Sequence, residues 1–99
     1  MMENYSRSLG KKNISISNDK VSTSSYGSKT LTATATNHSN KTFDHVSIQF
    51  IFYKGNSVVG TASDYLYYLG PNQSAKIDAS MYDIDSYDRY ELDYISASE

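Results

Sequence analysis

Apolar and polar residues alternate one by one along several short stretches of this 99-residue chain. In residues 30–36 threonines alternate with leucine and alanine, and Val46, Ile48, Phe50 and Phe52 occupy every second position of another stretch. A period of two places such residues on one face of a β-strand, because successive side chains of a strand point to opposite faces. The sequence lacks the apolar spacing i, i+3, i+4, i+7 of an amphipathic helix. The pattern therefore predicts an all-β fold.

Seven candidate strands follow from this alternation and from the turn residues between them. Short strands separated by turn signals about every 8–12 residues are typical of a sandwich or a barrel. Alanines at expected core positions are small enough to face large side chains across two sheets roughly 10 Å apart. We therefore predict an immunoglobulin-like two-sheet antiparallel β-sandwich of about seven strands. The candidate strands lie near residues 14–16, 21, 31–36, 46–53, 58–69, 75–81 and 90–94.

Three of these strands carry more specific expectations. The strand at 46–53 is predicted to be central and covered on both sides, because Ile51 and Tyr53 make its second face apolar too. Its core face is predicted to carry the four alternating residues named above. Gly60 is expected to bulge or end the strand that Val58 opens. In the last strand, Tyr90, Leu92 and Tyr94 are expected to lie on one face and to point into the core.

Composition and charge exclude several classes of protein. Residues 1–12 are polar and non-periodic, so they are predicted to be a flexible tail or linker before one domain at 13–99. The net charge is −2, whereas a general nucleic-acid surface would be basic, so no nucleic-acid partner is expected. No apolar run approaches the roughly 20 residues that span a bilayer, so no direct membrane insertion by this chain is expected. Cysteine is absent, which excludes disulfides and thiolate ligands.

The two histidines do not indicate a catalytic or zinc site. His38 lies in a predicted turn and His45 on a polar strand face, with no other strong zinc ligand close in the sequence. Asp44 and His45 are adjacent on a strand, so their side chains diverge and cannot form a triad with a serine. The Gly-x-Ser-x-Gly motif of a nucleophile elbow is also absent.

One acidic loop could in principle supply oxygen ligands to calcium, through Asp83, Asp85 and Asp88. The EF-hand pattern fails, because Tyr87 takes the fifth position and Asp88 takes the place of the glycine. A solvated acidic loop is expected instead. The chain is therefore predicted not to be an enzyme and to have no catalytic, cofactor-binding or metal-binding residues.

Tyrosine is the compositional anomaly, with ten residues and no tryptophan. Exposed tyrosine gives a large and rigid contact area at low entropic cost, as binding surfaces use it. The alternative is that tyrosines are scattered strand formers, each half-buried against a cross-strand neighbour. The first interpretation predicts a surface near the acidic C-terminal segment for a protein, a cationic peptide or a cell-wall glycan. Its residues are Tyr65, Tyr67 and Tyr68, expected on one short strand, and Tyr82 and Tyr87, expected to be exposed.

Three segments of the chain form a recognisable set: Phe50-Ile51-Phe52-Tyr53-Lys54 with the following 58–61, the turn Asn37-His38-Ser39, and Leu69-Gly70-Pro71. Together they make residues 31–94 resemble the FxLYD domain, a small bacterial module of immunoglobulin-like β-sandwich type. Phe52 stands where the motif has leucine, Lys54 where it has aspartate, and Asn72 where the family usually has glycine. The resemblance implies an extracellular or cell-envelope location and implies no activity.

The expected function is therefore that of a non-enzymatic extracellular or cell-envelope module, acting as a spacer or as a protein- or glycan-binding domain. The alternative is a stand-alone intracellular or phage-type structural protein that assembles through its sheet edges.

Overall fold

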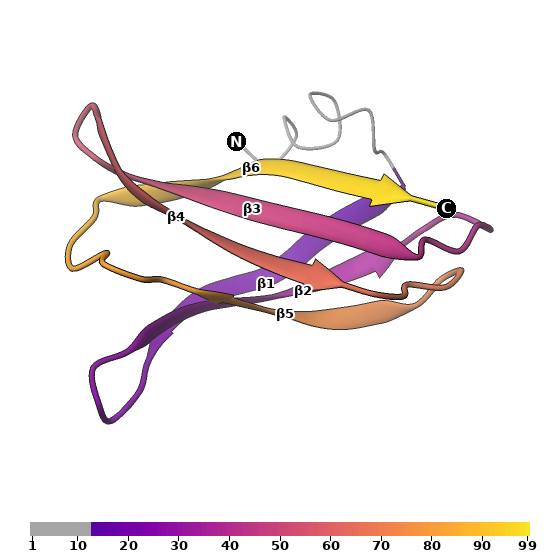
Figure 1. The fold of residues 1–99 in the computed structure, drawn as a ribbon, viewed down its shortest axis with the longest axis horizontal. Coiled ribbons are helices and arrows are strands. Elements are labelled where there is room, and N and C mark those ends of the chain that lie inside the picture. Colours follow the sequence, from indigo (N-terminus) through magenta and orange to yellow (C-terminus); the bar gives the residue numbers. More distant parts are fainter. Residues whose placement is uncertain (1–12) are drawn as a thin grey trace.

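Six antiparallel β-strands form two sheets in residues 13–99, the part of the chain that the computed structural model describes. Residues 1–12, the predicted tail or linker, lie outside the described residues. In the first sheet β2 (Lys29–Asn37) lies between β1 (Ile14–Thr23) and β5 (Ser74–Ser80), and in the second β3 (His45–Lys54) lies between β4 (Ser57–Leu66) and β6 (Arg89–Ser98) (Figure 1). These orders follow strands A-B-E and C′-C-F of an immunoglobulin sandwich. The predicted all-β two-sheet sandwich is confirmed.

The strand count is six rather than seven because a bulge bends β1 without ending it, and a second irregularity bends β4. Residues 14–16 and the segment around Val21 belong to the single strand β1, whose pairing with β2 shifts between Ser17 and Lys20. Asn18 in this bulge has a φ of 56°, in the left-handed region that asparagine tolerates. In β4 the pairing shifts beside Gly60, where Phe52 opposes Gly60 and Tyr53 opposes Val58, and the strand continues to Leu66.

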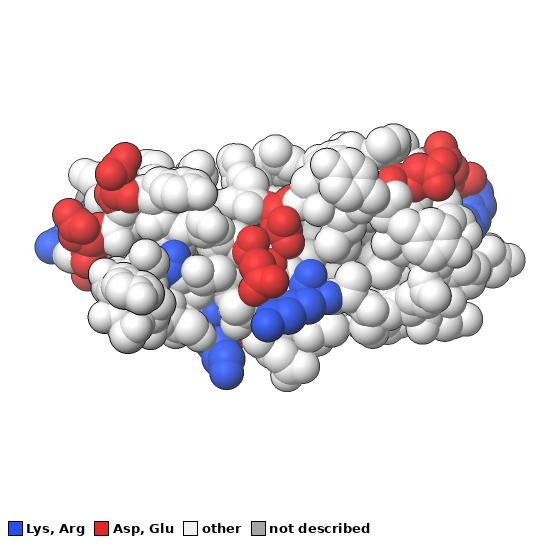
Figure 2. Space-filling model, turned by 60° about the horizontal axis from the view of Figure 1, so that its bottom comes forward, with Lys and Arg blue, Asp and Glu red and all other residues white. Residues whose placement is uncertain are grey.

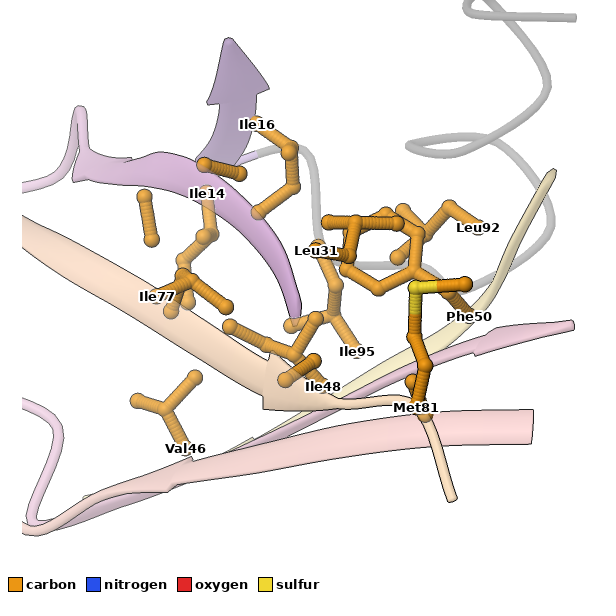
Figure 3. Close-up of a cluster of buried hydrophobic side chains, with 14 of the residues drawn as sticks. Ile14, Ile16, Leu31, Val46, Ile48, Phe50, Ile77, Met81, Leu92 and Ile95 are labelled. Atoms are coloured by element: carbon orange, nitrogen blue, oxygen red, sulfur yellow. The ribbon is translucent and has the colours of Figure 1, made fainter. Parts of the chain in front are cut away.

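The hydrophobic core lies between the two sheets (Figure 3). Val46, Ile48, Phe50 and Phe52 are each at most 1% exposed, which confirms the predicted core face of β3. Side chains of the first sheet meet them from the other side, and several are alanines, which leave room for the two phenylalanines. This set comprises Ile14, Ile16, Leu31, Ala33, Ala35, Ile77 and Ala79.

β3 is the central strand of its sheet, as predicted, but its second face is not covered by another layer. Ile51 and Tyr53 lie on the outer face and are half-buried. Ile51 lies between Thr61 of β4 and Glu91 of β6 in the register. The guanidinium carbon of Arg89 lies 4.2 Å from the centre of the Tyr53 ring. The predicted cover on both sides is therefore wrong, and only neighbouring side chains of the same sheet shield Ile51 and Tyr53.

β6 contains a bulge at Asp93 that corrects one core prediction. Gln49 of β3 opposes Tyr94, while the next residue, Phe50, opposes Leu92, so Asp93 is the extra residue. Leu92 and Ile95 both point into the core as a result. Tyr94 is 37% exposed and belongs to the outer face, so its predicted core position is wrong. The extra residue reverses the alternation for everything that follows it.

Aspartate side chains link the two sheets along both of their open sides. On one side Asp64 of β4 accepts a hydrogen bond from the backbone N–H of Asp78 in β5 at 2.9 Å. On the other, the Tyr90 hydroxyl of β6 donates to Asp19 of β1 at 2.6 Å. Figure 2, which brings the lower side of Figure 1 forward, shows acidic and basic side chains gathered near the middle of that surface. Each contact joins two edge strands that belong to different sheets.

The chain enters and leaves the sandwich at the same end (Figure 1). The carbonyl of Asn13 accepts a hydrogen bond from the N–H of His38, and the carbonyl of Ser98 accepts one from Asp44. Both acceptors therefore contact the single loop that connects β2 to β3. This placement follows from the even number of antiparallel strands that run between the two positions.

Candidate functional site

The outer faces of the two sheets differ in chemistry. On the first sheet, Thr30, Thr32, Thr34 and Thr36 of β2 point outward. The registers place serine or lysine of β1 on one side of each threonine and serine, lysine or aspartate of β5 on the other. We call this surface the hydroxyl face. It presents small polar groups and two lysines.

The outer face of the second sheet carries three tyrosines, Tyr53, Tyr65 and Tyr94. Tyr65 opposes Ser47, Tyr94 opposes Gln49, and Val58 opposes Tyr53. Tyr65 and Tyr94 are 41% and 37% exposed, which is the exposure of rings that lie along a sheet surface with one side in water. We call this surface the aromatic face, and its aromatic and aliphatic members are His45, Ile51, Tyr53, Val58, Tyr65 and Tyr94.

A row of hydrogen-bonded polar side chains crosses the aromatic face beside Tyr65 and Tyr94. The hydroxyl of Ser63 donates to Oε1 of Gln49 at 3.1 Å, and Nε2 of Gln49 donates to the Asp93 carboxylate at 2.9 Å. Gln49 is therefore fixed from both sides in the centre of the face. The bulge at Asp93 is what brings this carboxylate within reach of Gln49.

The charged groups of the aromatic face are paired with one another or with polar neighbours. Arg89 stacks on Tyr53, donates to the carbonyl of Gly55 at 3.0 Å, and lies 3.7 Å from the Glu91 carboxylate. Asp93 is bonded to Gln49, as described above. Arg89 covers the Tyr53 ring. Tyr65, whose ring also meets Tyr67 and whose hydroxyl lies 2.6 Å from His45, and Tyr94 are the partly exposed rings of this face.

The structure separates the five tyrosines of the predicted partner surface. Tyr65 lies in β4, whereas Tyr67 and Tyr68 follow the end of that strand, so the expectation of one short strand for all three is wrong. Tyr65 and Tyr67 do meet, with ring centroids 4.9 Å apart in an edge-to-face arrangement. Tyr67 is 76% and Tyr68 59% exposed. Tyr67 therefore adjoins the aromatic face at Tyr65.

Tyr82 and Tyr87 lie in the connection between β5 and β6, at the other end of β5. The seven residues of β5 put roughly 20 Å between its two ends. Tyr82 is exposed, but Tyr87 is half-buried with its ring 5.1 Å from that of Phe52, so its predicted exposure is wrong. The five tyrosines therefore do not share one surface.

The histidines have hydroxyl partners. Nδ1 of His45 lies 2.6 Å from the Tyr65 hydroxyl, and Nε2 of His38 lies 2.8 Å from the hydroxyl of Ser15. A serine–histidine pair is the first half of a hydrolytic site, but among residues 13–99 neither histidine forms an ion pair or hydrogen bond with a carboxylate that could orient the ring. The Ser15–His38 pair could not be predicted from the sequence, because 23 positions separate the two residues.

The acidic loop is tied to its neighbours through single contacts. The Asp88 carboxylate accepts a hydrogen bond from the N–H of Gly55 at 2.6 Å, and the ammonium of Lys29 donates to the carbonyl oxygen of Asp85 at 2.8 Å. An open hollow of about 460 Å³ lies between residues 27–30 and 80–85. Within the described range, no three His, Asp or Glu side chains converge in a way that could hold a metal ion.

Comparisons with known proteins gave no match among family models, curated proteins or solved structures. In residues 13–99 no helix has the length and apolarity needed to cross a membrane.

Proposed function

We propose that this chain is a non-enzymatic binding module of the bacterial cell envelope or the extracellular space, and that its partner docks on the aromatic face. The observation that carries the proposal is the contrast between the two outer faces. One presents serine, threonine and lysine, while the other presents half-exposed tyrosines around a fixed polar row. Tyrosine is enriched in binding surfaces because it offers a large contact area with few rotatable bonds.

The position of the chain ends supports a binding role over a spacer role. Asn13 and Ser98 both contact the β2–β3 loop, so the chain enters and leaves the sandwich at the same end. A domain attached in this way projects to the side of a longer chain and adds little to its length.

The edge strands argue against assembly through the sheet edges, which is the alternative function. β1 and β4 are interrupted by bulges, and β6 by the bulge at Asp93. β5 has one outward N–H occupied by the Asp64 carboxylate. Bulges and charged side chains of this kind prevent another strand from adding to an edge. The proposed location itself rests on the resemblance of residues 31–94 to the FxLYD domain.

The test is retention of the purified chain on isolated bacterial cell walls and on intact cells. The wild type is compared with a Tyr65→Thr, Tyr94→Thr double variant, since threonine removes both rings and keeps a high strand propensity. Thr34→Ala on the hydroxyl face is the matched control, and urea unfolding checks that all three chains are folded. Loss of retention in the double variant alone supports the proposal. Equal retention of all three chains, or retention of none, contradicts it.

A further inference from the structure

We propose that the ligand of the aromatic face is an uncharged linear glycan that spans Tyr65 and Tyr94. This inference rests on the proposed function and specifies its ligand. A sugar ring has an apolar C–H face and an edge of hydroxyl groups, so it needs an aromatic surface beside hydrogen-bonding groups. Tyr65, Gln49 and Tyr94 supply these two features next to each other on one sheet surface.

The polar row keeps hydrogen-bonding capacity for a ligand. Gln49 uses one N–H of its amide for the Asp93 carboxylate, and its other N–H can donate to a sugar hydroxyl. Ser63 donates its proton to Gln49, and its oxygen can still accept a hydrogen bond. Because Gln49 is held at both ends, little side-chain entropy is lost when a ligand binds.

The pairing of the charges favours an uncharged ligand over a cationic peptide. Arg89 lies 3.7 Å from Glu91 and offsets its charge, and one oxygen of Asp93 accepts a hydrogen bond from the neutral amide of Gln49, so an incoming ammonium would compete with partners already present. Arg89 also covers Tyr53, which removes that ring as a platform for an incoming cation. A polyanion would meet Glu91 and Asp93 at close range and would be repelled.

The spacing of the two open rings favours a chain over a single sugar. Tyr65 and Tyr94 lie on the two outer strands of the sheet, opposite Ser47 and Gln49 of β3, and are therefore two positions apart in register. Strand spacing and rise put roughly 12 Å between their Cα positions. Because this separation is wider than one pyranose ring, an oligomer that contacts both tyrosines should bind more tightly than a single sugar.

The experiment is a nuclear magnetic resonance titration of the full chain with four hexamers at millimolar concentrations: N-acetylglucosamine hexamer, cellohexaose, hexagalacturonate and hexalysine. The expected result is that a neutral hexamer shifts the resonances of Tyr65, Gln49 and Tyr94, while its monosaccharide has a much smaller effect. Tyr94→Thr and Gln49→Ala should each weaken binding about tenfold or more, and Thr34→Ala should leave binding unchanged.

The other outcomes separate this inference from the proposed function. Shifts on the aromatic face with hexalysine or hexagalacturonate, and none with the neutral hexamers, overturn the glycan inference and leave the aromatic face as the docking site. Retention on cell walls without any shift from the four hexamers has the same meaning. A neutral hexamer that shifts only resonances outside the aromatic face overturns both proposals.

Discussion

The side-chain amide of Asn37 donates a hydrogen bond of 3.0 Å to the carbonyl oxygen of Gly70, which lies 33 positions further along the chain. The same nitrogen lies 3.1 Å from the carbonyl oxygen of Leu69 and 2.7 Å from that of Lys41. Oδ1 of Asn37 accepts hydrogen bonds from the N–H and hydroxyl of Ser39. One fully buried side chain therefore joins the β2–β3 loop to the connection between β4 and β5.

Replacing Asn37 by alanine should lower the free energy of unfolding by about 1–3 kcal/mol, because it leaves buried carbonyl oxygens without donors. Asn37→Asp should be at least as destabilising, since it keeps the acceptor for Ser39 but places a carboxylate against carbonyl oxygens. Urea unfolding at neutral pH measures both changes. Wild-type stability in the Asn37→Asp variant would mean that the amide donors contribute nothing.

Phe50→Ala should cost about 3–5 kcal/mol, a loss comparable with the whole stability of a small domain. The ring is 1% exposed and packs edge-to-face on Tyr90, with the ring centroids 6.2 Å apart. Ile51→Ala, at the next position but on the outer face, is the matched control and should cost less. The midpoint and slope of urea unfolding give both values. A loss below about 1 kcal/mol for Phe50→Ala would show that this register of β3 is wrong.

Deleting Asp93 should be tolerated, with a loss below about 2 kcal/mol, because it removes the extra residue and leaves Leu92 and Ile95 pointing into the core. Deleting Glu91 should abolish cooperative unfolding, since it forces either Tyr90 or Leu92 to the opposite face. Circular dichroism and thermal melts distinguish the two deletions. The bulge assignment fails if the Asp93 deletion unfolds the chain and the Glu91 deletion does not.

Asp64→Ala should lower stability by up to about 1.5 kcal/mol and increase self-association, because the N–H of Asp78 is then exposed on an edge strand. Asp64→Asn keeps an oxygen acceptor at the same place and should restore most of the wild-type behaviour. Sedimentation velocity gives the oligomeric state, and urea unfolding gives the stability. If Asp64→Ala stays as monomeric and as stable as Asp64→Asn, the link between β4 and β5 has no protective role.

The inward-facing residues of the regular strands could be predicted from the sequence, since alternation alone defines them. Val46, Ile48, Phe50 and Phe52 are buried as expected. The outer position of Tyr94 could not be predicted. The bulge at Asp93 follows Leu92, and the apolar pattern up to Leu92 contains no sign of it. For the same reason the two halves of β1 were predicted as separate strands, although Val21 still opposes Leu31 after the bulge at Asn18.

The candidate site depends on features that the sequence pattern does not contain. Gln49, Ser63 and Asp93 come from three strands, and their contacts depend on the register and on the bulge in β6. The predicted tyrosine surface was built from neighbours in the sequence. Tyr67 meets Tyr65, but β5 separates this pair from Tyr82. The aromatic face exists because β4, β3 and β6 lie side by side, and the sequence pattern does not contain this strand order.

Asn13 and Ser98 lie at the same end of the sandwich, and this placement determines how the domain would respond to mechanical force. Ile14 pairs with Asn37 and Ser98 with His45, and these pairs are the first and last of their ladders. Tension between residues 13 and 98 would therefore load the β1–β2 and β3–β6 ladders from that end. The hydrogen bonds, which run perpendicular to the strands, would open one after another and would not share the load. A fold of this geometry yields at low force and is unsuited to carrying tension between two anchored points.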